Sequence, residues 1–182
     1  MPRRHFEEGY YHIYNRGFKK MTILKTQKDY EKIYLKIIEL LNKDDFKQIK
    51  ILSYAFLPNH FHFIVNLVPI PGSAIPGLTI SKFFGSFQGS YAKYFNIKNE
   101  RKWQVFEWRF KAKLIDNEEY FEKCMAYVNF NPVKHWIIDK IEDWPYISLH
   151  SIIWDRRSKI PLSWDKSINF MKYKDALSIL KI

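Results

Sequence analysis

Two histidines separated by one residue are the first feature of the chain with chemical potential. His60 and His62 lie in PNHFHFIV (58–65), whose aromatic and β-branched residues predict a strand. Side chains two positions apart in a strand point to the same face, so the two imidazoles project together. Such a pair can supply two ligands of a divalent metal ion. Two histidines that only hydrogen-bond to nearby backbone would give the same pattern, so the motif alone leaves both interpretations open.

The second feature is a polar stripe on a helix expected to end near residue 131. Lys123, Tyr127 and Asn131 follow one another at intervals of four residues, which puts them on one helix face. A tyrosine phenol has a pKa of about 10 in water, so it is a poor nucleophile unless a cation or metal stabilises its anion. Lys123 and a metal held by the two histidines are the candidate sources of that charge, and Lys123 is also a candidate DNA contact. Alternatively, Tyr127 is one of twelve structural tyrosines and Asn131 merely ends the helix.

A third feature is a strand expected at 103–115, in which basic and aromatic residues alternate. We expect Trp108 and Phe110 to share the face that packs inward. The basic residues expected on the opposite face are Arg109, Lys111 and Lys113. That face suits contacts with DNA phosphates, Arg109 above all, and some of the rings could stack on unpaired bases. A solvated strand face is the alternative, and Arg3 and Arg4 could form a flexible arm on DNA.

Composition narrows the function classes. The 182 residues allow one domain, and 30 Lys+Arg against 19 Asp+Glu give a formal charge of +11, which favours a polyanionic partner such as nucleic acid. The only cysteine, Cys124, excludes an internal disulfide and any cysteine-based zinc or iron–sulfur site, and it suits the cytoplasm. No run approaches the ~20 apolar residues of a membrane span, and Glu7 and Glu8 interrupt any signal peptide.

The elements that must position these residues follow from periodicity and turn residues. We expect a strand at 10–15, a helix at 28–41, and a hairpin of strands at 49–56 and 61–67. A loop at 69–77 should follow, then a helix capped by Thr79 or Ser81 and the strand at 103–115. The last helix should be capped by Asp116 or Asn117, begin at 118 or 119, and be limited by Pro132. This order predicts an α+β, ferredoxin-like fold: an antiparallel or mixed sheet with helices packed on one side. Residues 1–150 would form the domain, and 151–182 a C-terminal extension with a short helix near 172–180.

Together these features resemble a known family. PNHFHFIV followed by YVNFNPVKH (127–135) resembles the single-tyrosine HUH nucleases, named for histidine, hydrophobic residue, histidine. Within them it resembles the REP-associated tyrosine transposases, which are related to small insertion-sequence transposases. YYHIYNRG near the start, FEWRFKAKLI, and DWPYISLH after the third helix resemble the family in the expected order. The resemblance covers roughly residues 10–150.

The resemblance implies a role for each central residue. His60 and His62 would be metal ligands and Tyr127 the nucleophile. Asn131 would be the third ligand, since the position four residues after the tyrosine is glutamine in the insertion-sequence relatives and asparagine in the REP-associated group. The metal would be Mg²⁺ or Mn²⁺, and the substrate single-stranded DNA with an imperfect hairpin. Cleavage would leave a 5′-phosphotyrosine and a free 3′-hydroxyl, which allows strand transfer without a nucleotide cofactor. The sequence indeed lacks a P-loop pattern.

Two other functions are compatible with the sequence. One is a nucleic-acid-binding protein on the same fold that cleaves little or not at all. The other is a metal-dependent hydrolase that uses water, which is disfavoured because Asp116, Glu118 and Glu119 are placed to cap a helix. Insertion-sequence relatives act as dimers that exchange the tyrosine helix, whereas REP-associated relatives are expected to be monomers. The short link before the tyrosine helix favours a monomer here, although a homodimer is possible.

Overall fold

Four antiparallel strands in the order β2-β3-β1-β4 form the central sheet. The computed structural model describes residues 6–70, 76–153 and 158–163. The main elements are β1 (Gly9–Arg16), α1 (Gln27–Leu41), β2 (Ile49–Leu57), β3 (His60–Leu67), α2 (Pro76–Lys98), β4 (Lys111–Ile115), α3 (Glu118–Lys134) and α4 (Leu149–Ile153). Their order and pairing are those of a ferredoxin-like fold, so the expected fold class is confirmed.

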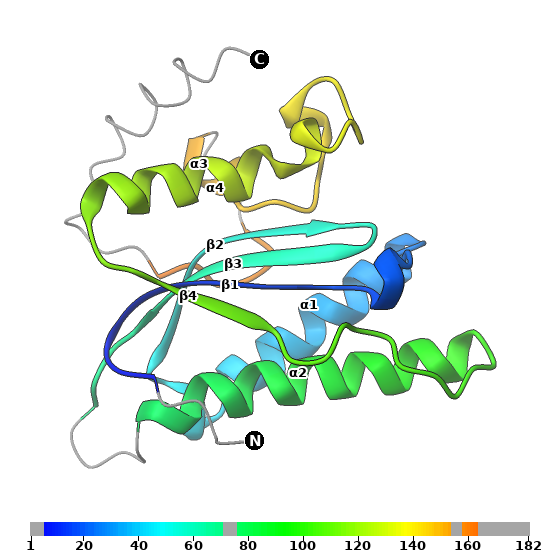
Figure 1. The fold of residues 1–182 in the computed structure, drawn as a ribbon, viewed down its shortest axis with the longest axis horizontal. Coiled ribbons are helices and arrows are strands. Elements are labelled where there is room, and N and C mark those ends of the chain that lie inside the picture. The colour runs from blue at the N-terminus through cyan, green and yellow to red at the C-terminus, as the bar shows by residue number, and fades with distance from the viewer. Residues whose placement is uncertain (1–5, 71–75, 154–157, 164–182) are drawn as a thin grey trace.

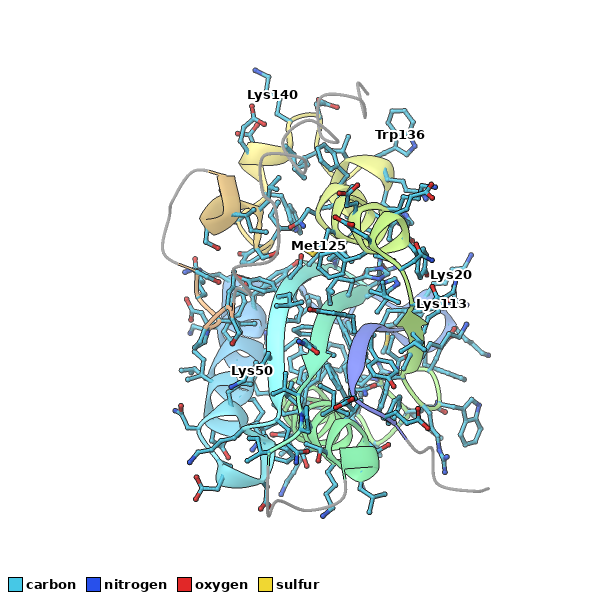
Figure 2. All side chains as sticks on the ribbon, turned by 90° about the vertical axis from the view of Figure 1, so that its left-hand side faces the viewer. Lys20, Lys50, Lys113, Met125, Trp136 and Lys140 are labelled. Carbon is cyan, nitrogen blue, oxygen red and sulfur yellow. The ribbon has the colours of Figure 1, made fainter. Side chains whose placement is uncertain are left out.

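Helices cover both faces of the sheet, not one face as expected (Figure 1). On one face, rings of β3 pack against α2: Phe61 contacts Phe87 and Phe63 contacts Phe84, at centroid distances of 5.1 and 5.4 Å. On the other face, α3 forms a second apolar cluster that includes Met125, which lies between helix and sheet (Figure 2). Side chains two apart in a strand share a face, so β1 and β3 send alternate residues to two different cores.

Two boundaries around α2 differ from those predicted. The helix begins at Pro76, so the loop ends earlier than residue 77, and neither Thr79 nor Ser81 caps the helix. Proline is favoured at the first helical position because its missing N–H has no intrahelical partner there. Thr79 instead lies inside the helix, and its hydroxyl donates to Gln48 Oε1 at 3.0 Å.

Only the last part of the strand expected at 103–115 exists. β4 starts at Lys111, and before it the chain makes a single bridge, between Gly17 and Phe106. Because residues 103–110 do not form a strand, their side chains do not alternate between an inward and an outward face as predicted. Phe110 is buried as expected, but Trp108 is 89% exposed, so its predicted packing inside the domain is wrong.

The α3 helix begins as predicted but ends later. The Asn117 side chain accepts a hydrogen bond from the Tyr120 N–H at 2.8 Å, which caps the first turn. Pro132 was expected to limit the helix near residue 131, but the helix continues to Lys134 with the proline inside it. The proline lies in the final turn, where one missing N–H leaves few later hydrogen bonds to disrupt. The last turn is closed instead by His135 N–H donating to the Asn131 carbonyl at 3.0 Å.

A buried polar network fixes α3 on the sheet. Asn129 Nδ2 donates to Ser53 Oγ of β2 at 3.0 Å, and Ser148 Oγ donates to Asn129 Oδ1 at 3.0 Å. The two serine hydroxyls are 2.8 Å apart, and the Tyr54 N–H donates to Ser148 Oγ at 3.0 Å. A buried polar group left without its hydrogen-bond partner destabilises the fold. A shift of α3 along the sheet would break these bonds, so the network strongly favours one register of the helix.

The segment after α3 completes the domain along the β2 edge. Phe56 N–H donates to the Tyr146 carbonyl and Ser148 N–H to the Tyr54 carbonyl, both at 2.9 Å. α4 crosses the expected boundary between residues 150 and 151, and Ile160 is fully buried in the core shared with α1 and α2. The helix expected near 172–180 lies outside the described residues. Within the described residues, no helix is both long and apolar enough to cross a membrane.

We predict that Asn129→Ala and Ser148→Ala each lower the free energy of unfolding by about 1–3 kcal/mol, because each leaves a buried partner without its hydrogen bond. Urea denaturation measures the loss, and the double variant should lose less than the sum. Ser86→Ala, at an exposed position of α2, is the control and should change stability by about 0.5 kcal/mol or less. Additive losses from the two network variants would contradict the coupling.

Candidate active site

A hollow of about 580 Å³ lies on the α3 face of the sheet, where β1 ends and β3 begins. His60, His62 and Tyr127 all line it, so the structure brings the two predicted features together. Three cations also line it: Arg16, Lys20 and Lys111. Glu107 is the carboxylate at its margin, and it pairs with Arg16 at 2.7 Å. The hollow combines imidazoles, a phenol and positive charge, which suits a phosphate-bearing ligand.

His60 has an asparagine oxygen against each of its ring nitrogens. Nδ1 lies 2.5 Å from Asn59 Oδ1, and Nε2 lies 3.0 Å from Asn131 Oδ1. Asn131 Nδ2 donates to the Tyr127 carbonyl at 3.3 Å, which orients Oδ1 toward His60. Burial lowers the pKa of His60, so the neutral ring is favoured and carries only one N–H. At the ring nitrogen without the N–H, the lone pair of His60 then faces the lone pair of an asparagine oxygen. A cation bound between these two atoms would stabilise that arrangement.

His62 is held by a third histidine, which the sequence analysis missed. His62 Nδ1 lies 2.9 Å from Nε2 of His12 on β1, and both side chains are buried. Burial lowers the pKa of His12 to about 4, helped by nearby Lys113, and burial beside other histidines lowers the pKa of His62 well below its usual value. Both rings are therefore neutral at pH 7, and one donates to the other. If His62 Nδ1 donates, its Nε2 keeps a lone pair for a metal.

Tyr127 stands edge-on to the histidine pair. Its ring is 5.5 Å from that of His62 with an interplanar angle of 89°, and the side chain is 36% exposed. Lys134 Nζ lies 4.5 Å from the Tyr127 ring centroid and can stabilise negative charge on the phenol. Lys123, expected to be the neighbouring cation, pairs instead with Glu119 at the exposed side of α3. Lys134 was missed because the helix was expected to end before it.

The other predicted DNA contacts are distributed differently. Lys111 lines the hollow, and Lys113 on the same strand lies with Nζ 4.3 Å from the Tyr120 ring at the β4 edge (Figure 2). Arg109 precedes β4 and lines a separate groove beside α2, so the expectation that it shares a strand face with the two lysines is wrong. Arg3 and Arg4 lie outside the described residues. The expected strand in YYHIYNRG could have indicated that His12 and Arg16 lie together, since residues separated by an even number of positions share a strand face.

The residues present fit a metal ion with mixed nitrogen and oxygen ligands. Among the described residues, no group of three or more His, Cys, Asp or Glu side chains is arranged to hold a metal. The available set is His60, His62 and the amide oxygen of Asn131. Imidazole and amide oxygen are compatible with Mn²⁺ and Mg²⁺, which complete their coordination with water or phosphate oxygens. The close approach of His60 Nε2 and Asn131 Oδ1 is the observation that supports this fit.

The buried neutral histidines predict how stability depends on pH. The pKa values of His12, His60 and His62 are lower in the folded chain than when unfolded, so the unfolded chain binds more protons as pH falls below about 6.5. The free energy of unfolding should therefore decrease from pH 7.5 to 4, with about 3 kcal/mol from His12 alone. Urea denaturation in EDTA should show this loss, and a shallower one for His12→Gln. Equal pH slopes for both proteins would contradict the buried neutral pair.

Comparison with known proteins agrees with the motifs. No protein-family model matches the sequence. A curated Haemophilus influenzae protein assigned to the REP-associated tyrosine transposases is 28% identical over 103 residues, 54% of this chain and 58% of that protein, so the match spans less than two thirds of the relative. A curated Escherichia coli K12 protein named REP-associated tyrosine transposase is 23% identical over 164 residues, 89% of this chain and 88% of that protein.

A solved structure extends the likeness to the fold. It is that of a REP-associated tyrosine transposase bound to a REP hairpin, with a TM-score of 0.62 and 20% identity, covering 93% of this chain and 92% of that one. The resemblance of this chain to the REP-associated tyrosine transposases is thus confirmed, in sequence by two curated relatives and in fold by this structure.

Proposed function

We propose that the protein is a metal-dependent, single-tyrosine DNA endonuclease and strand transferase. The observation that carries the proposal is that Tyr127, His60 and His62 line one hollow of one chain, with the buried Asn131 in contact with His60. The relatives named as transposases support the class of function. The cations that line the hollow support an anionic substrate.

In the proposed reaction Tyr127 attacks a DNA phosphodiester. The Tyr127 Oη–phosphorus bond forms, the bond from phosphorus to the 3′ oxygen breaks, and the phenol proton is lost to solvent while the departing 3′ oxygen gains one. His60, His62 and Asn131 would hold Mg²⁺ or Mn²⁺, which when bound polarises the non-bridging phosphate oxygens. Lys134 stabilises charge on the phenol, and Lys111 contacts the phosphate. A 3′-hydroxyl can reverse the step, which allows strand transfer.

The proposed substrate is single-stranded DNA with a hairpin. The solved relative is bound to a REP hairpin, and the net charge of +11 favours a polyanion. The protein is proposed to act as a monomer, because Tyr127 lies beside the histidines of its own chain. The link between β4 and α3 is only Asp116 and Asn117, which leaves little length for exchanging the helix between copies.

The nucleophile is tested by trapping a covalent protein–DNA adduct. Wild-type protein, incubated with labelled single-stranded hairpins and Mn²⁺, should give an adduct that survives denaturation and is lost in EDTA. Tyr127→Phe should abolish the adduct and keep hairpin affinity within a few fold, because it removes one oxygen and no charge. Tyr120→Phe, at the other tyrosine of α3, is the control and should form the adduct.

His62→Ala provides the metal arm of the same experiment and should abolish metal-dependent cleavage. Cleavage by His62→Ala with normal metal dependence would exclude the proposed metal site. Adduct formation by Tyr127→Phe would assign the nucleophile to another residue. Salt-sensitive hairpin binding without any adduct in wild type would favour the alternative, a DNA-binding protein that does not cleave.

Lys134→Met should slow adduct formation about tenfold at pH 7, because it removes the cation from the Tyr127 ring. The deficit should narrow at alkaline pH, where hydroxide assists loss of the phenol proton. Single-turnover rates across a pH series measure both effects. Lys123→Met removes the same charge from a lysine paired with Glu119, so it should leave the rate near that of wild type. Equal defects in the two variants would indicate a general effect of charge.

A further inference from the structure

A second hollow lies beside α2, outside the active-site hollow. It measures about 710 Å³ and separates α2 from the 103–110 segment; we call it the α2 groove. Trp103 and Trp108 line it and are 74% and 89% exposed. Large aromatic side chains are normally buried in a monomeric domain, and two exposed tryptophans at one groove suggest a surface that binds something flat and apolar.

The helix side of the α2 groove is kept open by two glycines. Gly85 and Gly89 are one turn apart on α2 and both line the groove. A Cβ built at either position would meet no atom within 4 Å, so close packing does not require glycine there. Among the described glycines only Gly9 has a positive φ, so backbone conformation does not require it either. Glycine is unfavourable inside a helix, and the property that these two provide is space.

The charges of the α2 groove select the chemistry of its occupant. Lys82 and Arg109 line it, and the described residues around it include no aspartate or glutamate. The one carboxylate within residues 103–110, that of Glu107, pairs with Arg16 at the active-site hollow. A groove with exposed indoles, open space and basic residues fits unpaired nucleotides, whose bases stack on aromatic rings and whose phosphates pair with cations.

The α2 groove and the active-site hollow are adjacent. Asn15 lines the active-site hollow, and its Nδ2 donates to Oε1 of Gln88, which lines the α2 groove, at 2.5 Å. The same Nδ2 donates to the Glu107 carbonyl at 3.0 Å. The lining of one hollow is thus hydrogen-bonded to the lining of the other, so a strand with a phosphate in the first needs only a short span to reach the second.

We propose that the α2 groove binds unpaired nucleotides of the DNA strand that enters the active site. The bases stack on Trp103 and Trp108, and the phosphates contact Lys82 and Arg109. This inference rests on the proposed function, since it extends the path of the same substrate. It assigns the groove to the single-stranded flank of a hairpin and not to the paired stem.

Three matched DNA ligands test the proposal. One hairpin carries a flank of about six thymidines, the second carries the same flank with abasic sites, and the third has no flank. Binding is measured in EDTA with the full chain, so that no cleavage occurs. Wild type should prefer the thymidine flank over the abasic flank by roughly 5- to 150-fold, the range for stacking one base on an aromatic ring.

Four variants locate that preference. Trp103→Ala and Trp108→Ala should each reduce it, and neither should change affinity for the hairpin without a flank. Gly89→Leu should abolish it by filling the groove while leaving thermal stability at least equal to wild type, because the new side chain has room and favours the helix. Leu35→Ala, at a 64% exposed residue of α1, is the control and should retain the preference.

The outcomes separate this proposal from the nuclease. A wild-type protein that does not distinguish thymidine from abasic flanks would overturn the α2 groove, as would an unchanged preference in Trp108→Ala and Gly89→Leu. Groove variants that alter sedimentation but not DNA binding would show a contact between copies of the chain instead. Adduct formation at Tyr127 without flank preference would retain the nuclease and reject the groove. Preference for the thymidine flank without an adduct would support the groove and reject the nuclease.

Discussion

The docking of α3 on the sheet is the constraint on which the candidate active site depends. The histidines come from β3, whereas Tyr127 and Asn131 come from α3, so a shift of this helix would separate them. Asn129 lies between Tyr127 and Asn131 and is bonded to both serines of the buried network. Apolar contacts alone tolerate small slides between layers, but a buried amide held by two hydroxyls does not. The hydrogen bonds of Asn129 thereby fix the positions of Tyr127 and Asn131 relative to the histidines of β3.

The electrostatics of the site follow from the same packing. Burial against α3 lowers the pKa values of His12, His60 and His62 and keeps their nitrogens available as neutral donors of lone pairs. The side chains of Arg16, Lys111 and, at the end of α3, Lys134 place positive charge around these neutral histidines. A basic pocket attracts a phosphate, while unprotonated imidazoles keep a nitrogen lone pair for a metal. Exposed, protonated histidines would attract the phosphate but would have no lone pair left to bind a metal.

Most of the fold could be predicted from the sequence, because it depends on local periodicity. The β-forming aromatic residues of YYHIYN, the helical spacing of 28–41 and the Pro58-Asn59 turn each indicate one element, and the order of the elements indicates the topology. The errors arose where tertiary contacts override local preference. Pro132 was expected to stop a helix that packing extends to Lys134, and 103–110 was expected to pair as a strand but makes a single bridge. The sequence also could not indicate that helices cover both faces, since this depends on which way each connection turns.

Four of the predicted site residues lie together in the structure, and two of their neighbours were not predicted. His60, His62, Tyr127 and Asn131 do meet, whereas His12 and Lys134 were not anticipated because their positions depend on strand pairing and on the late helix end. The central claim is that Tyr127 forms the bond to DNA. Trypsin separates the two tyrosines of α3, because Tyr120 falls in peptide 114–123 and Tyr127 in peptide 124–134. Mass spectrometry of the digested adduct should find the nucleotide on 124–134; finding it on 114–123 or elsewhere would contradict the account.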